Sequence, residues 1–157
     1  MGLKESRQIG MIAIDPRNSD VVYVAAEGSA WGPGGDRGLY KTTDGGKNWT
    51  SINSNLPEVG ATYTVAEDYV DAKLLFVGTQ FGLYVSNDGG KDWVAFKNGM
   101  PNTTIMDMEI QKRENDLVVA SFGRGFYVLD NAQSFRYFMK GYSDHIEAQS
   151  GDQMHCR

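Results

Sequence analysis

The sequence contains KTTDGGKNW at residues 41–49 and a near copy, VSNDGGKDW, at residues 85–93. Both copies fit the pattern S/T-x-D-x-G-x-x-W. A glycine allows the positive φ that a tight chain reversal requires, and an aspartate can accept hydrogen bonds from the backbone N–H groups inside it. The repeated stretch therefore predicts a structural turn that the fold uses more than once. We assign to this turn Thr42, Asp44, Gly46, Trp49, Ser86, Asp88, Gly90 and Trp93.

A ligand-binding interpretation of the same stretch fits less well. A phosphate-binding loop needs G-x-x-x-x-G-K-[ST] followed by a helix, and a calcium-binding EF-hand needs ligands at alternate positions and a final Glu. Neither copy has these features. The two histidines, His145 and His155, both fall near the polar C-terminus and do not suggest a zinc site. We therefore expect no metal and no cofactor.

The turn belongs to a longer unit that occurs three times. The triplets GLY, GLY and GFY begin at Gly38, Gly82 and Gly125, which spaces the units 43 or 44 residues apart. Each unit holds four short segments rich in Val, Ile, Tyr and Phe and bounded by Gly, Asp, Asn or Pro, as is typical of short strands. Before Lys140, no window has the 3.6-residue apolar period of a helix, and only residues 143–153 could form a short one.

Four strands in 40–50 residues is the period of a β-propeller blade. We therefore predict an all-β fold of three four-stranded antiparallel meanders. The expected blades are residues 9–53, 57–98 and 102–138, followed by a polar tail at residues 139–157 that includes the lone Cys156. The fourth strands are expected at WTSIN, WVAFKN and FRYFM, which begin at Trp49, Trp93 and Phe135.

The repeated turn resembles the Asp-box, also called the bacterial neuraminidase repeat, of sialidases, xyloglucanase-type glycoside hydrolases and sortilin propellers. Ile12–Trp49 resembles an early blade of bacterial sortilin-like propellers, whereas Leu74–Trp93 and Glu114–Asn131 resemble their last blades. The third copy of the turn, at Leu129–Phe135, lacks the Gly and the Trp, as terminal blades of that family do. The resemblance implies a truncated or internally deleted Asp-box propeller.

Three blades do not close a ring, because propellers typically have four to eight. An open set of three would leave two sheet faces with apolar surface that favours association. We expect two copies to close into a six-bladed ring with twofold symmetry, as a homodimer. The alternative is an open wedge cut from a longer protein.

Composition limits the classes of partner. The chain has 157 residues and a net charge of −5, which argues against a nucleic-acid surface. No apolar run is long enough to span a membrane, and the N-terminus lacks the apolar stretch of a signal peptide. As written, the chain is expected in the cytoplasm, although a secreted or periplasmic parent without its leader would look the same.

The candidate ligand site lies on the connections between second and third strands. The first of these connections is longer than the others and contains GSAWGPGGDR at residues 28–37. Aromatic rings and arginines suit sugars, peptides and carboxylates. The predicted ligand-binding residues are Trp31, Asp36, Arg37, Gln80, Phe81 and Arg124.

Structural roles remain open for the same residues. Trp31 could pack its own loop, and Arg37 and Arg124 could pair with acids between blades. Phe81 and Phe122 could belong to the core between blades.

Three functions follow as hypotheses. The first is non-enzymatic binding of a protein, peptide or glycan on the face that carries residues 28–37. The second is a glycoside hydrolase or an inactive remnant of one, for which Glu27, Asp36 and Glu67 are possible carboxylates. The third is a self-associating propeller fragment with no activity of its own. No catalytic residue is assigned.

Overall fold

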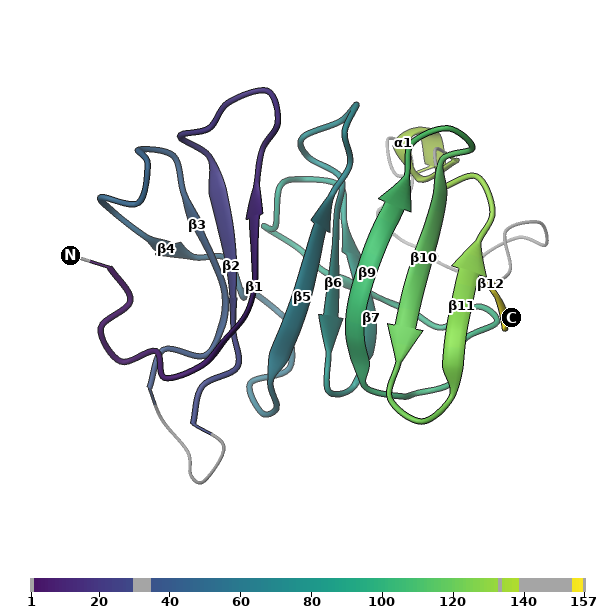
Figure 1. Cartoon of the computed structure of the whole chain (residues 1–157), viewed down its shortest axis with the longest axis horizontal. Helices are drawn as coiled ribbons and strands as arrows, with labels where there is room; N and C mark the ends of the chain where they lie inside the picture. The colour runs from purple at the N-terminus through teal and green to yellow at the C-terminus, as the bar shows by residue number, and fades with distance from the viewer. Residues whose placement is uncertain (1, 30–34, 133, 139–153, 157) are drawn as a thin grey trace.

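The computed structural model describes residues 2–29, 35–132, 134–138 and 154–156. The described residues form three four-stranded antiparallel sheets (Figure 1). The first sheet contains β1 (Ile9–Ile14), β2 (Val22–Ala26), β3 (Gly38–Thr42) and β4 (Thr50–Ser51). The second sheet contains β5 (Thr62–Glu67), β6 (Leu75–Thr79), β7 (Gly82–Ser86) and β8 (Val94–Phe96). The third sheet contains β9 (Ile105–Gln111), β10 (Asp116–Ser121), β11 (Gly125–Leu129) and β12 (Met154–Cys156).

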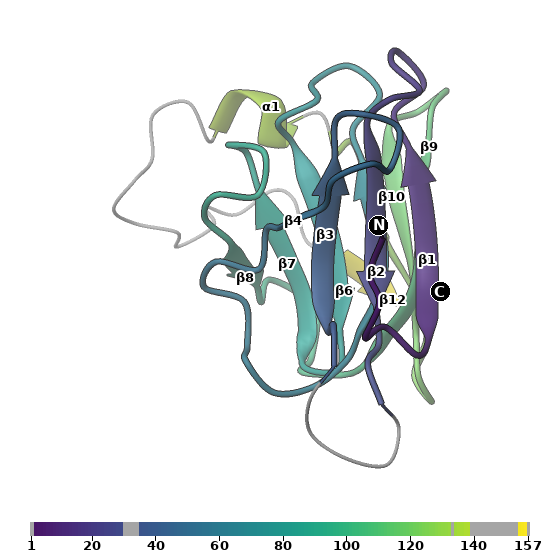
Figure 2. The same ribbon diagram turned by 90° about the vertical axis from the view of Figure 1, so that its left-hand side faces the viewer.

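The sheets pack side by side, as blades of a propeller do. Figure 2 shows β1 and β9 on one side of the molecule and the outer strands β4 and β8 on the other. The first strands of successive sheets lie next to each other, since β1 contacts β5 and β5 contacts β9. The prediction of an all-β fold of propeller blades is therefore confirmed.

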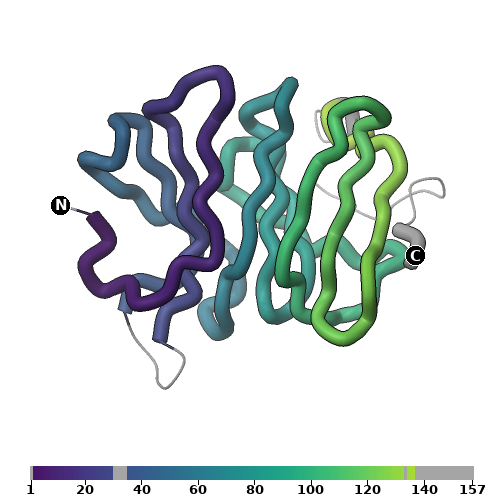
Figure 3. Tube along the Cα trace, in the orientation of Figure 1, coloured from purple at the N-terminus to yellow at the C-terminus, as the bar shows by residue number. Residues whose placement is uncertain are grey.

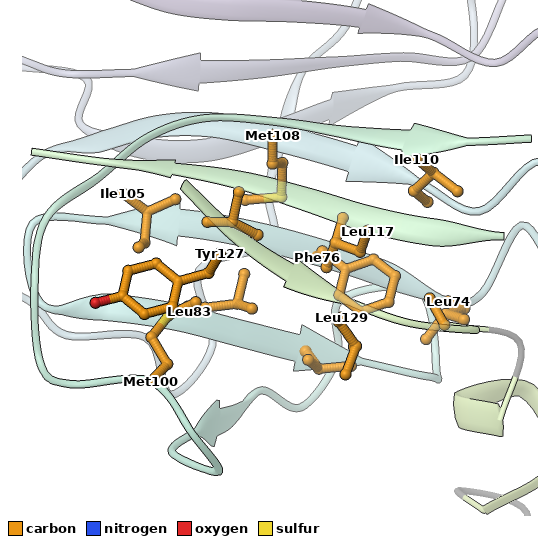
Figure 4. Packing of buried hydrophobic residues seen from close by; sticks show 13 residues of the cluster. Leu74, Phe76, Leu83, Met100, Ile105, Met108, Ile110, Leu117, Tyr127 and Leu129 are labelled. Atoms are coloured by element: carbon orange, nitrogen blue, oxygen red, sulfur yellow. The ribbon is translucent and has the colours of Figure 1, made fainter. Parts of the chain in front are cut away.

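Apolar side chains that alternate along the strands form one core at each junction between sheets. At the junction of the first and second sheets, the buried members include Tyr23, Leu39, Val65, Val77 and Trp93. At the junction of the second and third sheets they include Phe76, Leu83, Met108, Leu117 and Tyr127 (Figure 4). The second strand of the second sheet, β6, is buried along its whole length because both its faces are covered by neighbouring sheets.

The strand register repeats from sheet to sheet. Val24 of β2 lies opposite Tyr40, Val77 of β6 opposite Tyr84, and Val119 of β10 opposite Tyr127. Positions in one sheet can therefore be matched to positions in the next, residue by residue.

The segment FRYFM does not form the fourth strand of the third sheet, so that prediction is wrong. Its residues 135–138 lie in a short helix, α1 (Ser134–Phe138), and the Phe135 ring packs against Phe76 and Phe96 with centroids 5.9 and 5.7 Å apart. Arg136 pairs with the buried Asp68 at 2.6 Å. These contacts with the second sheet hold the segment away from β11.

The fourth strand of the third sheet comes instead from the end of the chain. The backbone of β12 pairs with β11, with Cys156 opposite Tyr127 and Met154 opposite Leu129. The expectation of a tail outside the blades is therefore wrong for residues 154–156. The possible helix at residues 143–153 lies outside the described residues. Figure 3 shows the N-terminal segment beside the first sheet, at the end of the molecule opposite the third sheet.

In the part of the chain that the structure describes, no helix has the length and apolar character needed to cross a membrane.

Candidate functional site

The sheets present two edges with different connections. The lower edge in Figure 1 carries the β2–β3, β6–β7 and β10–β11 connections, and we call it the loop edge. The opposite edge carries the β1–β2 and β3–β4 connections, and we call it the turn edge. The described members of the predicted ligand-binding set lie on the loop edge, and the DGGK stretches lie on the turn edge.

A cavity of about 260 Å³ lies at the loop edge between the first and second sheets. One side is formed by Arg37 and Gly38 at the start of β3, and the other by Thr79 at the end of β6. The rest of the lining comes from the β4–β5 connection and the first residue of β5: Asn53, Ser54, Leu56, Pro57, Glu58, Val59, Gly60, Ala61 and Thr62. Apolar side chains, two charges of opposite sign and several hydroxyls therefore surround one space.

Asn53 fixes the position of the β3 end of the cavity. Its side-chain Oδ1 accepts a hydrogen bond from the Leu39 N–H at 2.6 Å, and its Nδ2 donates to the Arg37 carbonyl at 3.2 Å. The asparagine takes the place of a strand partner just beyond the two-residue β4. A side chain at Gly38, where φ is 108°, would collide with Asn53, so this close approach requires glycine.

Arg37 is half-buried and ties the β2–β3 loop to the cavity wall. Its Nη2 donates a hydrogen bond to the Ser29 carbonyl at 2.8 Å. Its Nε is buried and has no acceptor among the described residues. A buried donor without a partner is costly, so an oxygen atom from a ligand or from solvent would be favoured at this position.

Gln80 and Phe81 reach the same region from the β6–β7 turn. A Cβ at Gly60, which lines the cavity, would lie 2.5 Å from Phe81 Cε2 and 3.1 Å from Gln80 Oε1. Thr104 donates its hydroxyl to the Gln80 carbonyl at 3.2 Å. The structure therefore brings Arg37, Gln80 and Phe81 to one stretch of the loop edge.

Of the described residues predicted to bind a ligand, Arg37 alone lines this cavity, whereas Gln80 and Phe81 lie beside its wall at Gly60. Trp31 lies outside the described residues. Asp36 Oδ2 accepts a hydrogen bond from the Glu5 N–H at 3.0 Å, which ties the N-terminal segment to the loop. Arg124 lies in the exposed β10–β11 turn, and Phe122 is exposed there rather than buried between blades, so the core interpretation of Phe122 is wrong.

The β4–β5 connection supplies most of the cavity lining and was not predicted from sequence. Residues 53–61 fall between the strand segments that define the repeat, although Leu56 and Pro57 recur 44 residues later as Met100 and Pro101. Pro57 and Gly60 mark an irregular connection, but such residues do not indicate which loop it will face. The recurrence of Leu56 and Pro57 indicates a shared connection between blades, but it does not indicate a ligand site.

The two DGGK stretches have the same hydrogen-bond pattern at the turn edge. Thr42 donates its hydroxyl to Asp44 Oδ1 at 2.7 Å and accepts from the Gly46 N–H at 3.0 Å. Asp44 in turn accepts from the Asn48 N–H at 2.9 Å. The backbone hydrogen bond from Asn48, with those from Thr42 and the Asn48 side chain, lowers the pKa of Asp44 to about 2.

The second copy repeats these contacts. Ser86 donates to Asp88 Oδ1 at 2.8 Å and accepts from the Gly90 N–H at 2.9 Å. The N–H groups of Lys91 and Asp92 donate to the Asp88 carboxylate at 2.8 and 3.1 Å. Burial opposes ionisation of Asp88, but these hydrogen bonds outweigh it and lower its pKa. The carboxylates are thus occupied inside their own turns.

A second group of charges joins the first two sheets at the turn edge. Arg17 donates to Asp15 Oδ1 at 2.8 Å and to Glu67 Oε1 at 2.7 Å. The Tyr23 hydroxyl lies 3.4 Å from the same Glu67 oxygen, and Glu67 Oε2 is buried without a partner among the described residues. Burial, aided by the charge of Asp15, raises the pKa of Glu67 to about 7.

A metal site is not evident in the residues that the structure places, since they contain no group of three or more His, Cys, Asp or Glu side chains that could hold an ion.

Comparison with solved structures identifies the fold. The chain is similar to an ancestral GH74 enzyme (TM-score 0.61, 21% identity, 82% of this chain and 18% of the other). It is also similar to the GH74 xyloglucanase of Xanthomonas campestris (TM-score 0.61, 19% identity, 94% and 24%). A third is the GH74 enzyme of Niastella koreensis (TM-score 0.57, 18% identity, 82% and 29%).

These proteins are β-propellers, and at such identities the likeness concerns the fold alone. The chain spans between 18% and 29% of the length of these three proteins. No protein-family model matches the sequence, and no curated protein matches it.

Proposed function

We propose that this chain is a propeller-type binding module that binds a protein, a peptide or a glycan at the loop edge and does not catalyse a reaction of the ligand. The cavity between the first two sheets is the observation that carries the proposal. Its lining combines the charged residues Arg37 and Glu58 and the hydroxyl-bearing residues Ser54, Thr62 and Thr79 with apolar residues. A few polar groups on an apolar floor are typical of ligand sites.

Hydrolysis has less support than binding. A glycosidase needs two carboxyl groups on either side of the bond that it cleaves. Glu58 is the only carboxylate among the residues that line the described cavity. Glu67 lies at the opposite edge, and Asp36 is engaged by the Glu5 backbone.

We further propose that the repeated turns are Asp-boxes and that the chain is akin to sortilin-like or glycosyl-hydrolase-type repeat propellers. The blade units proposed from sequence, at residues 9–53, 57–98 and 102–138, fit this view, with β12 added to the third sheet. Two copies of the chain would then close into one six-bladed ring. If no ligand is found, the third hypothesis is favoured, in which the chain is a self-associating fragment with no activity of its own.

The binding proposal is tested by screening the purified chain against a glycan array and a displayed peptide library, and then measuring hits by calorimetry. We expect Phe81→Ala and Arg37→Ala to weaken binding about tenfold or more. Arg113→Ala, an exposed change far from the cavity, is expected to leave the affinity unchanged. Circular dichroism checks that each variant is folded.

Two outcomes would contradict the proposal. One is a ligand whose affinity is the same for wild type and for both loop-edge variants. The other is release of sugar from xyloglucan oligosaccharides or aryl glycosides by the wild-type chain, which would support the hydrolase alternative.

A further inference from the structure

The first sheet has an apolar face that no other described sheet covers. This face points away from the second sheet and carries Ile12 and Ile14 of β1, which are 59% and 60% exposed. Val24 and Tyr40 lie beside them on the same face, as the pairing of Ile12 with Val24 and of Val24 with Tyr40 shows. We call this surface the first end face.

The repeat shows what kind of surface this is. By strand register, Ile12 corresponds to Val65 in the second sheet and to Met108 in the third. Val65 and Met108 are both buried against the preceding sheet, as is Ile110, the counterpart of Ile14. The first end face therefore has the same apolar positions that the fold covers with a preceding blade elsewhere in the molecule.

Trp49 supports the same conclusion independently. Its counterpart, Trp93, is only 3% exposed and donates its indole N–H to the Ile52 carbonyl of the preceding blade at 2.8 Å. Trp49 instead borders an open hollow of about 270 Å³ on the first end face, with Leu3, Ile9, Ile12 and Val24. Among the described residues it has no hydrogen-bond acceptor for its indole.

The third sheet has the complementary surface. Its face away from the second sheet carries Val118 and Ala120 of β10 and Phe126 and Val128 of β11, and Phe126 is 56% exposed. In the second sheet the corresponding positions include Phe76, Leu83 and Val85, which cover the next blade. We call this surface of the third sheet the second end face.

Charges of opposite sign also lie near the two faces. Asp107 and Glu109 are exposed on β9 and lie on the second end face, opposite Ala120 and Val118. Lys4, Glu5 and Arg7 are exposed just before β1, so positive charges outnumber the negative charge there. Because the first strands of neighbouring blades are adjacent in this fold, a third sheet placed against a first sheet would bring these opposite charges near each other.

We propose that a second copy of this chain covers both end faces: the third sheet of each copy packs on the first sheet of the other, with Trp49 buried at each contact. The inference rests on the proposed six-bladed ring and specifies how it closes. The two contacts are equivalent by the twofold axis, but each joins two different surfaces. Each chain therefore needs both of its end faces.

The test uses light scattering of the full chain over a dilution series. The double variant Ile12→Glu, Ile14→Glu places acids opposite the acidic β9, and Phe126→Glu disrupts the other face. We expect wild type to be a dimer and both variants to be monomers with unchanged circular dichroism. Val70→Glu, at a residue 58% exposed in the β5–β6 turn, is the control and is expected to remain dimeric.

Mixing the two defective variants distinguishes this arrangement from others. Each variant retains the surface that the other lacks, so a mixed dimer held by one contact is expected. If the double variant is a monomer but Phe126→Glu remains a dimer, the first sheets meet each other and the inference is wrong. If both variants remain dimers, other surfaces close the pair, whereas a wild-type monomer at every concentration rejects the ring itself.

Discussion

At the scale of single residues, the aspartates of the repeated turn act on their own backbone. Asp44 and Asp88 each accept N–H groups that the strand ladder cannot satisfy at a reversal. Their pKa values are lowered because the hydrogen bonds favour the ionised form. This stabilisation is present above the ordinary pKa of a carboxyl group and is lost as the pH falls through the lowered value.

Asp88→Ala is expected to lower the free energy of unfolding by about 1–2 kcal/mol, since two backbone N–H groups lose a charged acceptor. Urea denaturation at neutral pH measures the change. Asp92→Ala is the matched control, because only its backbone takes part in the turn, and its effect is expected to stay below about 0.5 kcal/mol. Equal effects of the two substitutions would argue against the turn role of the carboxylate.

The raised pKa of Glu67 predicts that stability depends on pH in the opposite direction to that expected for Asp44 and Asp88. The pKa of Glu67 is about 7 in the folded chain, above the ordinary value of a glutamate. At a pH between these two values, the folded state holds a proton that the unfolded state has released. The wild-type free energy of unfolding should therefore fall, relative to that of Glu67→Gln, as the pH rises from 5 to 8, by about 2 kcal/mol. Parallel pH profiles for the two proteins would contradict the raised pKa.

At the scale of elements, α1 links the third blade to the second. Arg136 lies over the Tyr69 ring, 5.1 Å from its centroid, and pairs with both oxygens of Asp68. The Asp68 side chain is almost fully buried, so it depends on this partner. Arg17 has a related role between the first two sheets, where it joins Asp15 to Glu67.

Arg136→Leu is expected to lower the free energy of unfolding by about 3 kcal/mol, because it leaves the Asp68 carboxylate buried without its ion pair. Thermal and urea unfolding both report the change. Arg113→Leu removes an arginine from a solvent-exposed pair with Glu114, and we expect less than about 0.5 kcal/mol from it. A similar loss of stability in both variants would mean that burial does not increase the contribution of the Arg136–Asp68 ion pair.

The blades could be predicted from sequence because their signals are local. The glycines of GLY, GLY and GFY do begin β3, β7 and β11, as the period indicated. The segment after Leu129 could not be assigned correctly, since its aromatic residues suit a strand as well as a helix. The choice depends on Phe76, Phe96 and Asp68, which are distant in the sequence.

The candidate site was predictable only in part, for the same reason. Arg37 and Phe81 were identified because the repeat shows which connections share an edge. Asn53 and Glu58 were missed because they lie in an irregular connection between blades. Which loop such a connection faces depends on tertiary packing, which local sequence patterns do not report.

At the scale of the whole molecule, the three sheets form an incomplete propeller with two different ends. The first end presents Ile12, Ile14 and Trp49, and the second presents Phe126 beside the acidic residues of β9. A ring of two copies would cover both ends and place two loop-edge cavities on one face. Binding at that face and closure of the ring are separate proposals, each with its own test.

The most direct test of this account is small-angle X-ray scattering with mass determination on the purified chain. A closed ring predicts a mass twice the 17.3 kDa of the chain and a flat, disc-like profile with a central channel. A particle of 17.3 kDa with the profile of an open wedge, at every concentration measured, would contradict it.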